Sequence, residues 1–320
     1  MILRDWREAD PATLRDCYER ERRHWLDRLS WDTTWTWATV EDARFGQGLP
    51  GFLAVDGAGR VGGWAFYVVD DGRAHIGGFV ADSDEATRVL LDGVLHGSEE
   101  SGADATACFV LDRAPGLAAA LADHGFAVEP FHYLSLPLDP AGVQRTSDSG
   151  GFRLQPEDQP VTTADAWRDG DLGAVAALLE AAYTSDAGRH FAPGGNWEKY
   201  AIGLVDQAGC GVFDTNVTRM ARGDEGLLGA VLVTAVSPAT AHIAQLAIHP
   251  AHRGRGLASQ LTREAARRAA EAGKSELTLL VGDRNEQARR LYASMGFTQK
   301  ATFLAAWRDS HRAALSVAAS

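Results

Sequence analysis

A cluster of glycine and arginine residues lies between a β-prone segment and a long amphipathic segment in the C-terminal half. Residues 241–273 read AHIAQLAIHPAHRGRGLASQLTREAARRAAEAG. The alternating first part predicts a strand that ends near Ile248, because Pro250 has no N–H to donate to a sheet. The apolar and alanine positions that follow predict a helix that opens within residues 253–258 and runs to about Ala272.

The start of this predicted helix has the chemistry of an anion-binding site. The first N–H groups of a helix have no partner within it, and the helix dipole places positive potential there. Gly254 and Gly256 let a ligand approach the backbone closely, and Arg253 and Arg255 add charge. We therefore predict that the segment binds a diphosphate, although a glycine-rich turn with its arginines in solvent is the alternative. The spacing differs from the loops that bind nicotinamide cofactors or nucleoside triphosphates.

The elements around this segment occur twice in the chain. Each half has an apolar hairpin arm followed by a strand that contains Ala-His-Ile, at residues 74–76 and 241–243. A helix, a strand ending in Asp-Arg and a second helix that closes on Gly-Phe, at residues 125–126 and 296–297, come next. The shared order indicates a duplication, and the alternation of strands and helices predicts an α/β fold with two mixed domains.

The predicted domain boundary lies in a polar stretch. Residues 139–151, DPAGVQRTSDSGG, are rich in Gly, Ser and Asp and read as a linker. We assign residues 1–138 to the first domain and residues 152–320 to the second. The second domain opens with FRLQP, residues 152–156, which predicts a short strand before a helix.

Two segments of the second half resemble a known family. Residues 246–258, LAIHPAHRGRGLA, resemble the acetyl-CoA-binding signature of the GCN5-related N-acetyltransferase (GNAT) superfamily, whose loop runs Gln/Arg-x-x-Gly-x-Gly/Ala. Residues 285–297, NEQARRLYASMGF, are similar to the family's Asn…Ala…Leu-Tyr…Gly-Phe pattern. The resemblance covers about residues 151–305, and the first half resembles the family only as a degenerate copy. It therefore implies two tandem GNAT-like domains with a mixed sheet.

The resemblance implies a cofactor and the residues that bind it. In this family the strand before the loop pairs with the pantetheine arm, the loop amides hold the pyrophosphate, and an asparagine of the next helix contacts the pantetheine. The cofactor-binding residues expected on this basis are Leu246, Ala247, Ile248, Arg253, Gly254, Arg255, Gly256, Leu257, Ala258, Ser259 and Asn285. The implied cofactor is acetyl-CoA or another acyl-CoA. The implied reaction is direct attack of a small-molecule primary amine on the thioester.

The resemblance also suggests an acid and a base. Tyr292 occupies the position of the family's usual general acid, and a phenol with a reference pKa of ~10 suits protonation of a leaving thiolate. The alternative for Tyr292 is packing at helical spacing. His242 stands where many members carry a Glu or His base, and a neutral imidazole accepts a proton near pH 7. His75 occupies the same place in the first half, however, which favours a structural role for both histidines.

The first half lacks the residues that the cofactor requires. Its counterpart of the loop carries the carboxylates Asp82, Asp84 and Glu85, which repel a diphosphate, and Leu121 stands where Tyr292 does. We expect this half not to bind CoA. Four tryptophans gather in it, for which we expect burial in the core or the domain interface rather than an aromatic acceptor site: Trp25, Trp31, Trp35 and Trp37.

The charge and cysteine content of the chain narrow the classes of partner that it could bind. The net charge of -12 disfavours nucleic acid and anionic membranes. The 3 scattered cysteines offer no metal-ligand spacing and suit a reducing compartment, so we expect a cytoplasmic monomer or homodimer without a metal. A CoA-binding sensor or scaffold without turnover is the alternative to an enzyme, and the presence of Tyr292 and Asn285 argues against it. Within the enzyme class, a mycothiol synthase-like activity or acetylation of antibiotics or polyamines stays open.

Overall fold

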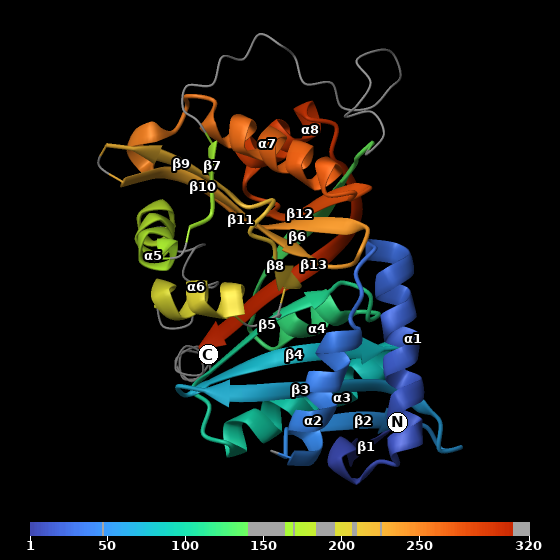
Figure 1. The fold of residues 1–320 in the computed structure, drawn as a ribbon. Helices are drawn as coiled ribbons and strands as arrows, with labels where there is room; N and C mark the ends of the chain where they lie inside the picture. The colour runs from blue at the N-terminus through green and yellow to red at the C-terminus, as the bar shows by residue number, and fades with distance from the viewer. Residues whose placement is uncertain are drawn as a thin grey trace.

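The strands of the computed structural model form one mixed sheet that runs through both halves of the chain (Figure 1). The structure describes residues 1–46, 48–139, 164–168, 170–183, 196–206, 210–224 and 226–309. The predicted strand at residues 152–156 and nearly all of the predicted linker lie outside these residues. The strand order is β1-β2-β3-β4-β5-β13-β6-β12-β11-β10-β9-β7, with β8 paired to β10.

The two halves contain the same succession of elements, except that the C-terminal half has one additional short strand at Val212–Phe213. The N-terminal half comprises β1 (Ile2–Asp5), α1 (Pro11–Leu29), α2 (Thr34–Gly46), β2 (Gly51–Val55), β3 (Val61–Asp70), β4 (Arg73–Ala81), α3 (Asp84–Glu100), β5 (Ala105–Leu111), α4 (Leu117–Asp123) and β6 (Ala127–Pro137). The C-terminal half comprises β7 (Ala164–Ala166), α5 (Asp171–Ala182), α6 (Trp197–Asp206), β8 (Val212–Phe213), β9 (Arg219–Gly223), β10 (Gly226–Ala235), β11 (Thr240–Ile248), α7 (Leu257–Glu271), β12 (Glu276–Gly282), α8 (Glu286–Ser294) and β13 (Thr298–Asp309). The predicted α/β fold with a mixed sheet is confirmed.

Local chemistry sets several of the helix ends. Asp10 accepts a hydrogen bond from the N–H of Thr13, and Pro11 occupies the first turn of α1, where no N–H is required. Ser83 accepts from Ala86 at the start of α3. Helices cover both faces of each half: α3 and α4 pack on one face of the N-terminal sheet and α1 and α2 on the other, while α7 and α8 lie opposite α5 and α6.

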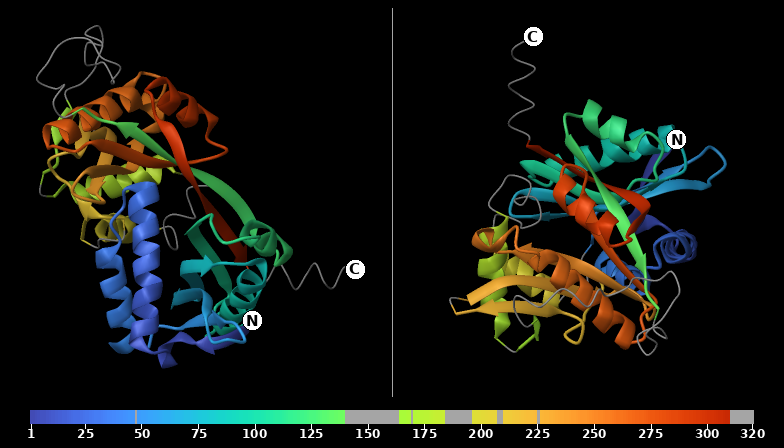
Figure 2. Two further views of the ribbon diagram at one scale, coloured as in Figure 1. Left: turned by 90° about the vertical axis from the view of Figure 1, so that its right-hand side faces the viewer. Right: turned by 90° about the horizontal axis from the view of Figure 1, so that it is seen from above.

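The last strand of each half lies in the sheet of the other half. Residues 131–137 of β6 pair antiparallel with residues 276–282 of β12, and residues 303–309 of β13 pair antiparallel with residues 105–111 of β5. β6 and β13 also pair with each other. Figure 2 shows these two strands crossing side by side between the halves. The halves are therefore joined by backbone hydrogen bonds as well as by side chains.

An aromatic cluster fills the junction of the halves. Its buried members are Leu29, Trp31, Leu111, Tyr133, Val236 and Phe303. Trp25 packs against them, so the expected interface burial is confirmed for Trp25 and Trp31. Trp37 instead stacks on Tyr18 in the N-terminal core, with ring centroids 4.9 Å apart. The expectation is wrong for Trp35, which is 76% exposed on α2. Trp31 precedes this helix, so the two side chains share no helical face.

Candidate functional site

Strands β11 and β12 separate partway along their length. Their parallel pairing joins residues 240–243 to residues 276–279 and then stops, although β11 continues to Ile248. β10 stays paired to the other edge of β11, with a register shift at Ala244 that marks a β-bulge. The edge of β11 over residues 244–248 therefore has no partner strand among the described residues. Leu246 and Ile248 face the α7 side of the sheet, and Ala247 is buried toward α5 and α6.

Six consecutive backbone N–H groups are free where α7 begins. Within the described part of the chain, the N–H groups of residues 254–259 have no hydrogen-bond acceptor, and the first paired one is that of Gln260, which donates to Gly256 O at 3.0 Å. Gly254 and Gly256 have φ of +75° and +78°, which other residues rarely adopt. A Cβ added at either glycine meets no atom within 4 Å, so the space beside them is open. We call residues 254–259 the amide cradle.

The two arginines of the loop have different surroundings. Arg253 donates from Nη2 to Ala182 O at 2.7 Å and from Nε to Ile248 O at 3.3 Å. Its guanidinium group therefore holds the loop against the end of α5. The sequence had suggested only that Arg253 adds positive charge for the diphosphate. Arg255 is exposed and has no carboxylate partner among the described residues. It is the loop cation that remains available to an anionic ligand.

We call the place where β11 and β12 separate the split. Asn285 and Tyr292 lie on its α8 side. Asn285 caps α8 by accepting a hydrogen bond from the N–H of Ala288 at 3.1 Å, so its Nδ2 group remains available to a ligand. Tyr292 is 6% exposed and packs edge-on against Phe297. Its hydroxyl group has no hydrogen-bond partner among the residues that the structure describes. Burial raises the pKa of Tyr292, with a smaller contribution from Tyr183, so the phenol keeps its proton at neutral pH.

Sequence reasoning missed Tyr183, which lies at the end of α5. Its hydroxyl donates to Gln245 Oε1 at 2.9 Å, and Gln245 Nε2 donates in turn to the hydroxyl of Tyr200. Burial raises the pKa of Tyr183 to about 12. Trp197 stacks on the Tyr183 ring at 5.4 Å between centroids. Tyr183 belongs to no sequence motif, because it is simply an aromatic residue at the end of an apolar helix. Only its contact with β11 indicates that it belongs to the site.

His242 is buried at the junction of the halves. Its ring lies against Trp31 at 5.0 Å and Tyr133 at 5.9 Å between centroids, and both of these residues come from the N-terminal half. Nδ1 is 2.9 Å from Thr278 Oγ1, which itself donates to Ala241 O and can therefore accept the Nδ1 proton. Burial lowers the pKa of His242 to about 3. These surroundings disfavour His242 as a general base and favour the structural alternative.

The shifted pKa of His242 makes stability depend on pH. Its pKa is lower in the folded chain than in the unfolded chain, so the unfolded chain binds the proton first as the pH falls. Stability is therefore lost below about pH 6.5, the unfolded value, and the loss continues to about pH 3. We expect the His242 contribution to fall by about 2 kcal/mol between pH 7 and pH 5. Urea unfolding of the wild type and of His242→Gln at both pH values measures this. An equal pH effect in both proteins would contradict it.

The corresponding place in the N-terminal half differs from the amide cradle. Strands β4 and β5 also stop pairing early, after residues 73–76 and 105–108. Here α3 begins directly after β4, and Ser83 caps it. Asp84 and Glu85 occupy its first turn and compensate the positive end of the helix. Leu121 is fully buried at the place that corresponds to Tyr292.

The described residues contain no group of three or more His, Cys, Asp or Glu side chains placed to hold a metal ion. No helix among them has the length and apolar character needed to cross a membrane.

The comparisons with known proteins agree with this geometry. Residues 175–297 match the model of the acetyltransferase (GNAT) family, and no curated protein matches the chain. The fold is similar to that of a GCN5-related N-acetyltransferase from Sphaerobacter thermophilus, with a TM-score of 0.62 at 17% identity over 85% of each chain. It is also similar to a GCN5-related glucosamine N-acetyltransferase region of a fungal multi-domain GH3 β-N-acetylglucosaminidase, with a TM-score of 0.60 at 13% identity over 96% of this chain and 38% of that chain. A tandem GNAT protein from the clavulanic acid biosynthesis pathway has a TM-score of 0.52 at 18% identity over 82% of this chain and 83% of its own. At such identities these structures establish the fold alone.

Proposed function

Because residues 175–297 form a domain of the acetyltransferase (GNAT) family, we propose that the chain transfers an acyl group, acetyl in the first instance, from acyl-CoA to the primary amine of a small molecule. The observation that carries this proposal is the amide cradle. Six unpaired N–H groups at the positive end of α7, with open space beside two glycines, suit a diphosphate. The free edge of β11 lies next to the cradle in the chain and suits an extended amide-bearing arm.

The residues of the split have distinct proposed roles. The cradle and Arg255 bind the diphosphate, and the backbone of residues 246–248 and the amide group of Asn285 hold the pantetheine. When bound, acyl-CoA would supply a thioester for direct attack by the neutral amine, and the attacking nitrogen would lose one proton to water. Tyr292 would protonate the departing thiolate and would then regain a proton from solvent. Burial raises the pKa of Tyr292, which keeps the phenol protonated until the thiolate forms but also makes it a weaker acid than a free phenol.

Tyr183 and Gln245 are better suited than His242 to bind and orient the amine. While Tyr183 donates to Gln245, its oxygen keeps a lone pair that can accept a hydrogen bond from an amine N–H. The geometry of the site agrees, since the Tyr183 hydroxyl contacts Gln245 on β11 and also approaches Leu246 O at 3.3 Å. We propose that this pair orients the amine. His242, with its low pKa and aromatic packing, would instead have a structural role, in packing β11 against Trp31.

We further propose that only the C-terminal domain, assigned to residues 152–320, binds the cofactor. The Ser83 cap and the acidic first turn of α3 support this. The domain at residues 1–138 would act by supplying β6 and the interface, with residues 139–151 as the connection. Isothermal titration with acetyl-CoA should give one site per chain. Two sites would contradict the assignment.

The decisive experiment measures thiol release from acetyl-CoA across a panel of primary amines, with mass detection of the acylated product. We expect acceptor-dependent CoA release with at least one amine. Cofactor binding without release for any amine would instead favour the sensor or scaffold. The panel should include aminoglycosides, polyamines and the acceptor of mycothiol synthase, which tests the mycothiol synthase-like alternative.

A further inference from the structure

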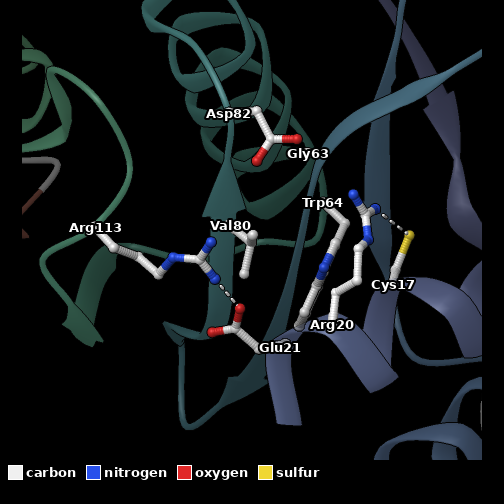
Figure 3. A pocket seen from close by; sticks show the side chains of 8 residues that line it. All are labelled: Cys17, Arg20, Glu21, Gly63, Trp64, Val80, Asp82 and Arg113. Atoms are coloured by element: carbon white, nitrogen blue, oxygen red, sulfur yellow. Dashed lines mark hydrogen bonds and ion pairs between the residues drawn. The ribbon is translucent and has the colours of Figure 1, made fainter. Parts of the chain in front are cut away.

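A cavity of about 60 Å³ lies in the N-terminal half, far in sequence from the amide cradle (Figure 3). It is bounded by α1, by β3 and by the end of β4. The side chains that carry the argument are Arg20, Glu21, Trp64, Val80, Asp82 and Arg113. Nothing in the proposed acyl transfer uses these residues. In the order of the duplication, Val80 and Arg113 correspond to Ala247 and Arg284, which flank the split between β11 and β12.

A buried ion pair forms one wall of the cavity. Glu21 is 4% exposed, and Arg113 Nη1 donates to its Oε2 while Trp25 Nε1 donates to its Oε1 at 2.6 Å. Burial raises the pKa of Glu21, and the charge of Arg113 opposes that shift. Both carboxylate oxygens are thus occupied within the protein. The pair holds the Arg113 guanidinium at the cavity, and its other N–H donors have no acceptor among the described residues.

Two opposite charges at the cavity lack charged partners. Within the described ranges Arg20 makes one hydrogen bond, from Nη2 to the Cys17 sulfur at 3.5 Å, and no carboxylate there forms an ion pair with it, although its charge acts on Glu21. The Asp82 carboxylate has no hydrogen-bond or ion-pair partner within the described ranges, although its charge acts on Glu21. Figure 3 places Asp82 on one side of the cavity and the two arginines on others. The site therefore presents separated positive and negative groups.

The size of the cavity selects a small ligand. Because one water molecule needs roughly 10–15 Å³ of such volume, the cavity holds the equivalent of about four to six waters. That is about the number of non-hydrogen atoms in glycine or alanine. Trp64 is 2% exposed and adds an apolar wall to the cavity.

We propose that this cavity binds a small free α-amino acid, with its carboxylate on Arg20 and Arg113 and its ammonium group on Asp82. A simple carboxylate leaves Asp82 facing an anion, and a simple amine leaves two arginines facing a cation. Only a zwitterion matches both sets of charges at once. The site is separate from the cofactor split, so it stands whether or not the acyl transfer is correct.

Isothermal titration of the full chain tests the ligand class with matched fragments. Glycine and L-alanine are the probes, and propionate and ethylamine each lack one of the two charged groups of alanine. We expect one amino acid site per chain and at least tenfold weaker binding of each fragment. Absence of binding by both amino acids at millimolar concentration overturns the proposal. Equal binding of alanine and propionate overturns it too, because the cavity is then a plain anion site.

Variants locate the site. Arg20→Gln and Asp82→Asn change exposed side chains and should each weaken L-alanine binding at least tenfold. Arg23→Gln is the control and should bind L-alanine like the wild type. Arg23 is exposed on the same helix, but its side chain approaches Glu19 and not the cavity. Acetyl-CoA affinity should stay unchanged in all three proteins. Wild-type alanine affinity in both Arg20→Gln and Asp82→Asn would show that the amino acid binds elsewhere.

Discussion

A Gly256→Asp variant is expected to lose at least 100-fold in affinity for acetyl-CoA while it remains folded. The new carboxylate would lie within the amide cradle, where six free N–H groups and Arg255 otherwise attract a diphosphate. The loss corresponds to about 2.7 kcal/mol, which is modest for placing like charges in contact at a partly desolvated site. Asp tolerates a left-handed backbone better than most residues, but the φ of +78° at this position still strains the backbone and costs some stability.

A matched control separates the charge effect from backbone strain. Gly273 follows the other end of α7 with φ of +80°, and a Cβ added there also meets no atom within 4 Å. Gly273→Asp should therefore lose a similar amount of stability and keep its cofactor affinity. Isothermal titration and thermal unfolding of both variants give the comparison. Wild-type affinity in Gly256→Asp would remove the cradle from the cofactor site and the proposed function with it.

Tyr292→Phe is expected to lower kcat by about 10²–10³-fold and to leave the affinity for acetyl-CoA nearly unchanged. The substitution removes only the hydroxyl group, so the ring still packs against Phe297 and the core keeps its volume. The hydroxyl has no hydrogen-bond partner among the described residues, so its removal leaves no buried group unpaired. Steady-state kinetics with the best amine of the panel, together with titration of the cofactor, measure both quantities.

A change of leaving group makes the Tyr292 test specific. If the phenol protonates the departing thiolate, the deficit should shrink with an acyl donor whose thiol is more acidic and needs less protonation. Tyr18→Phe is the control, because its hydroxyl bonds to Glu41 in the N-terminal half at 3.2 Å and faces no cofactor residue. A wild-type rate in Tyr292→Phe, or a deficit that is independent of the leaving group, would exclude this phenol as the acid.

The sequence by itself determined the features that depend on consecutive residues. The amide cradle was predictable because glycines with positive φ and the free amides of a helix start are properties of one short segment. The Asn285 cap and the repeated order of elements are local in the same sense. Family resemblance then pointed to Tyr292, whose place on α8 follows from helical spacing.

The tertiary structure alone decided which distant segments meet. After a duplication both sheets offer equivalent edges, so no local pattern could reveal that β13 pairs with β5 and β6 with β12. This exchange, with the packing it brings, places the base candidate His242 against Trp31 and Tyr133 of the other half, and burial there lowers its pKa to about 3. The bond of Arg253 to Ala182 is likewise non-local. Backbone hydrogen bonding between neighbours is encoded locally, whereas burial and its electrostatic effects depend on partners that only the assembled fold supplies.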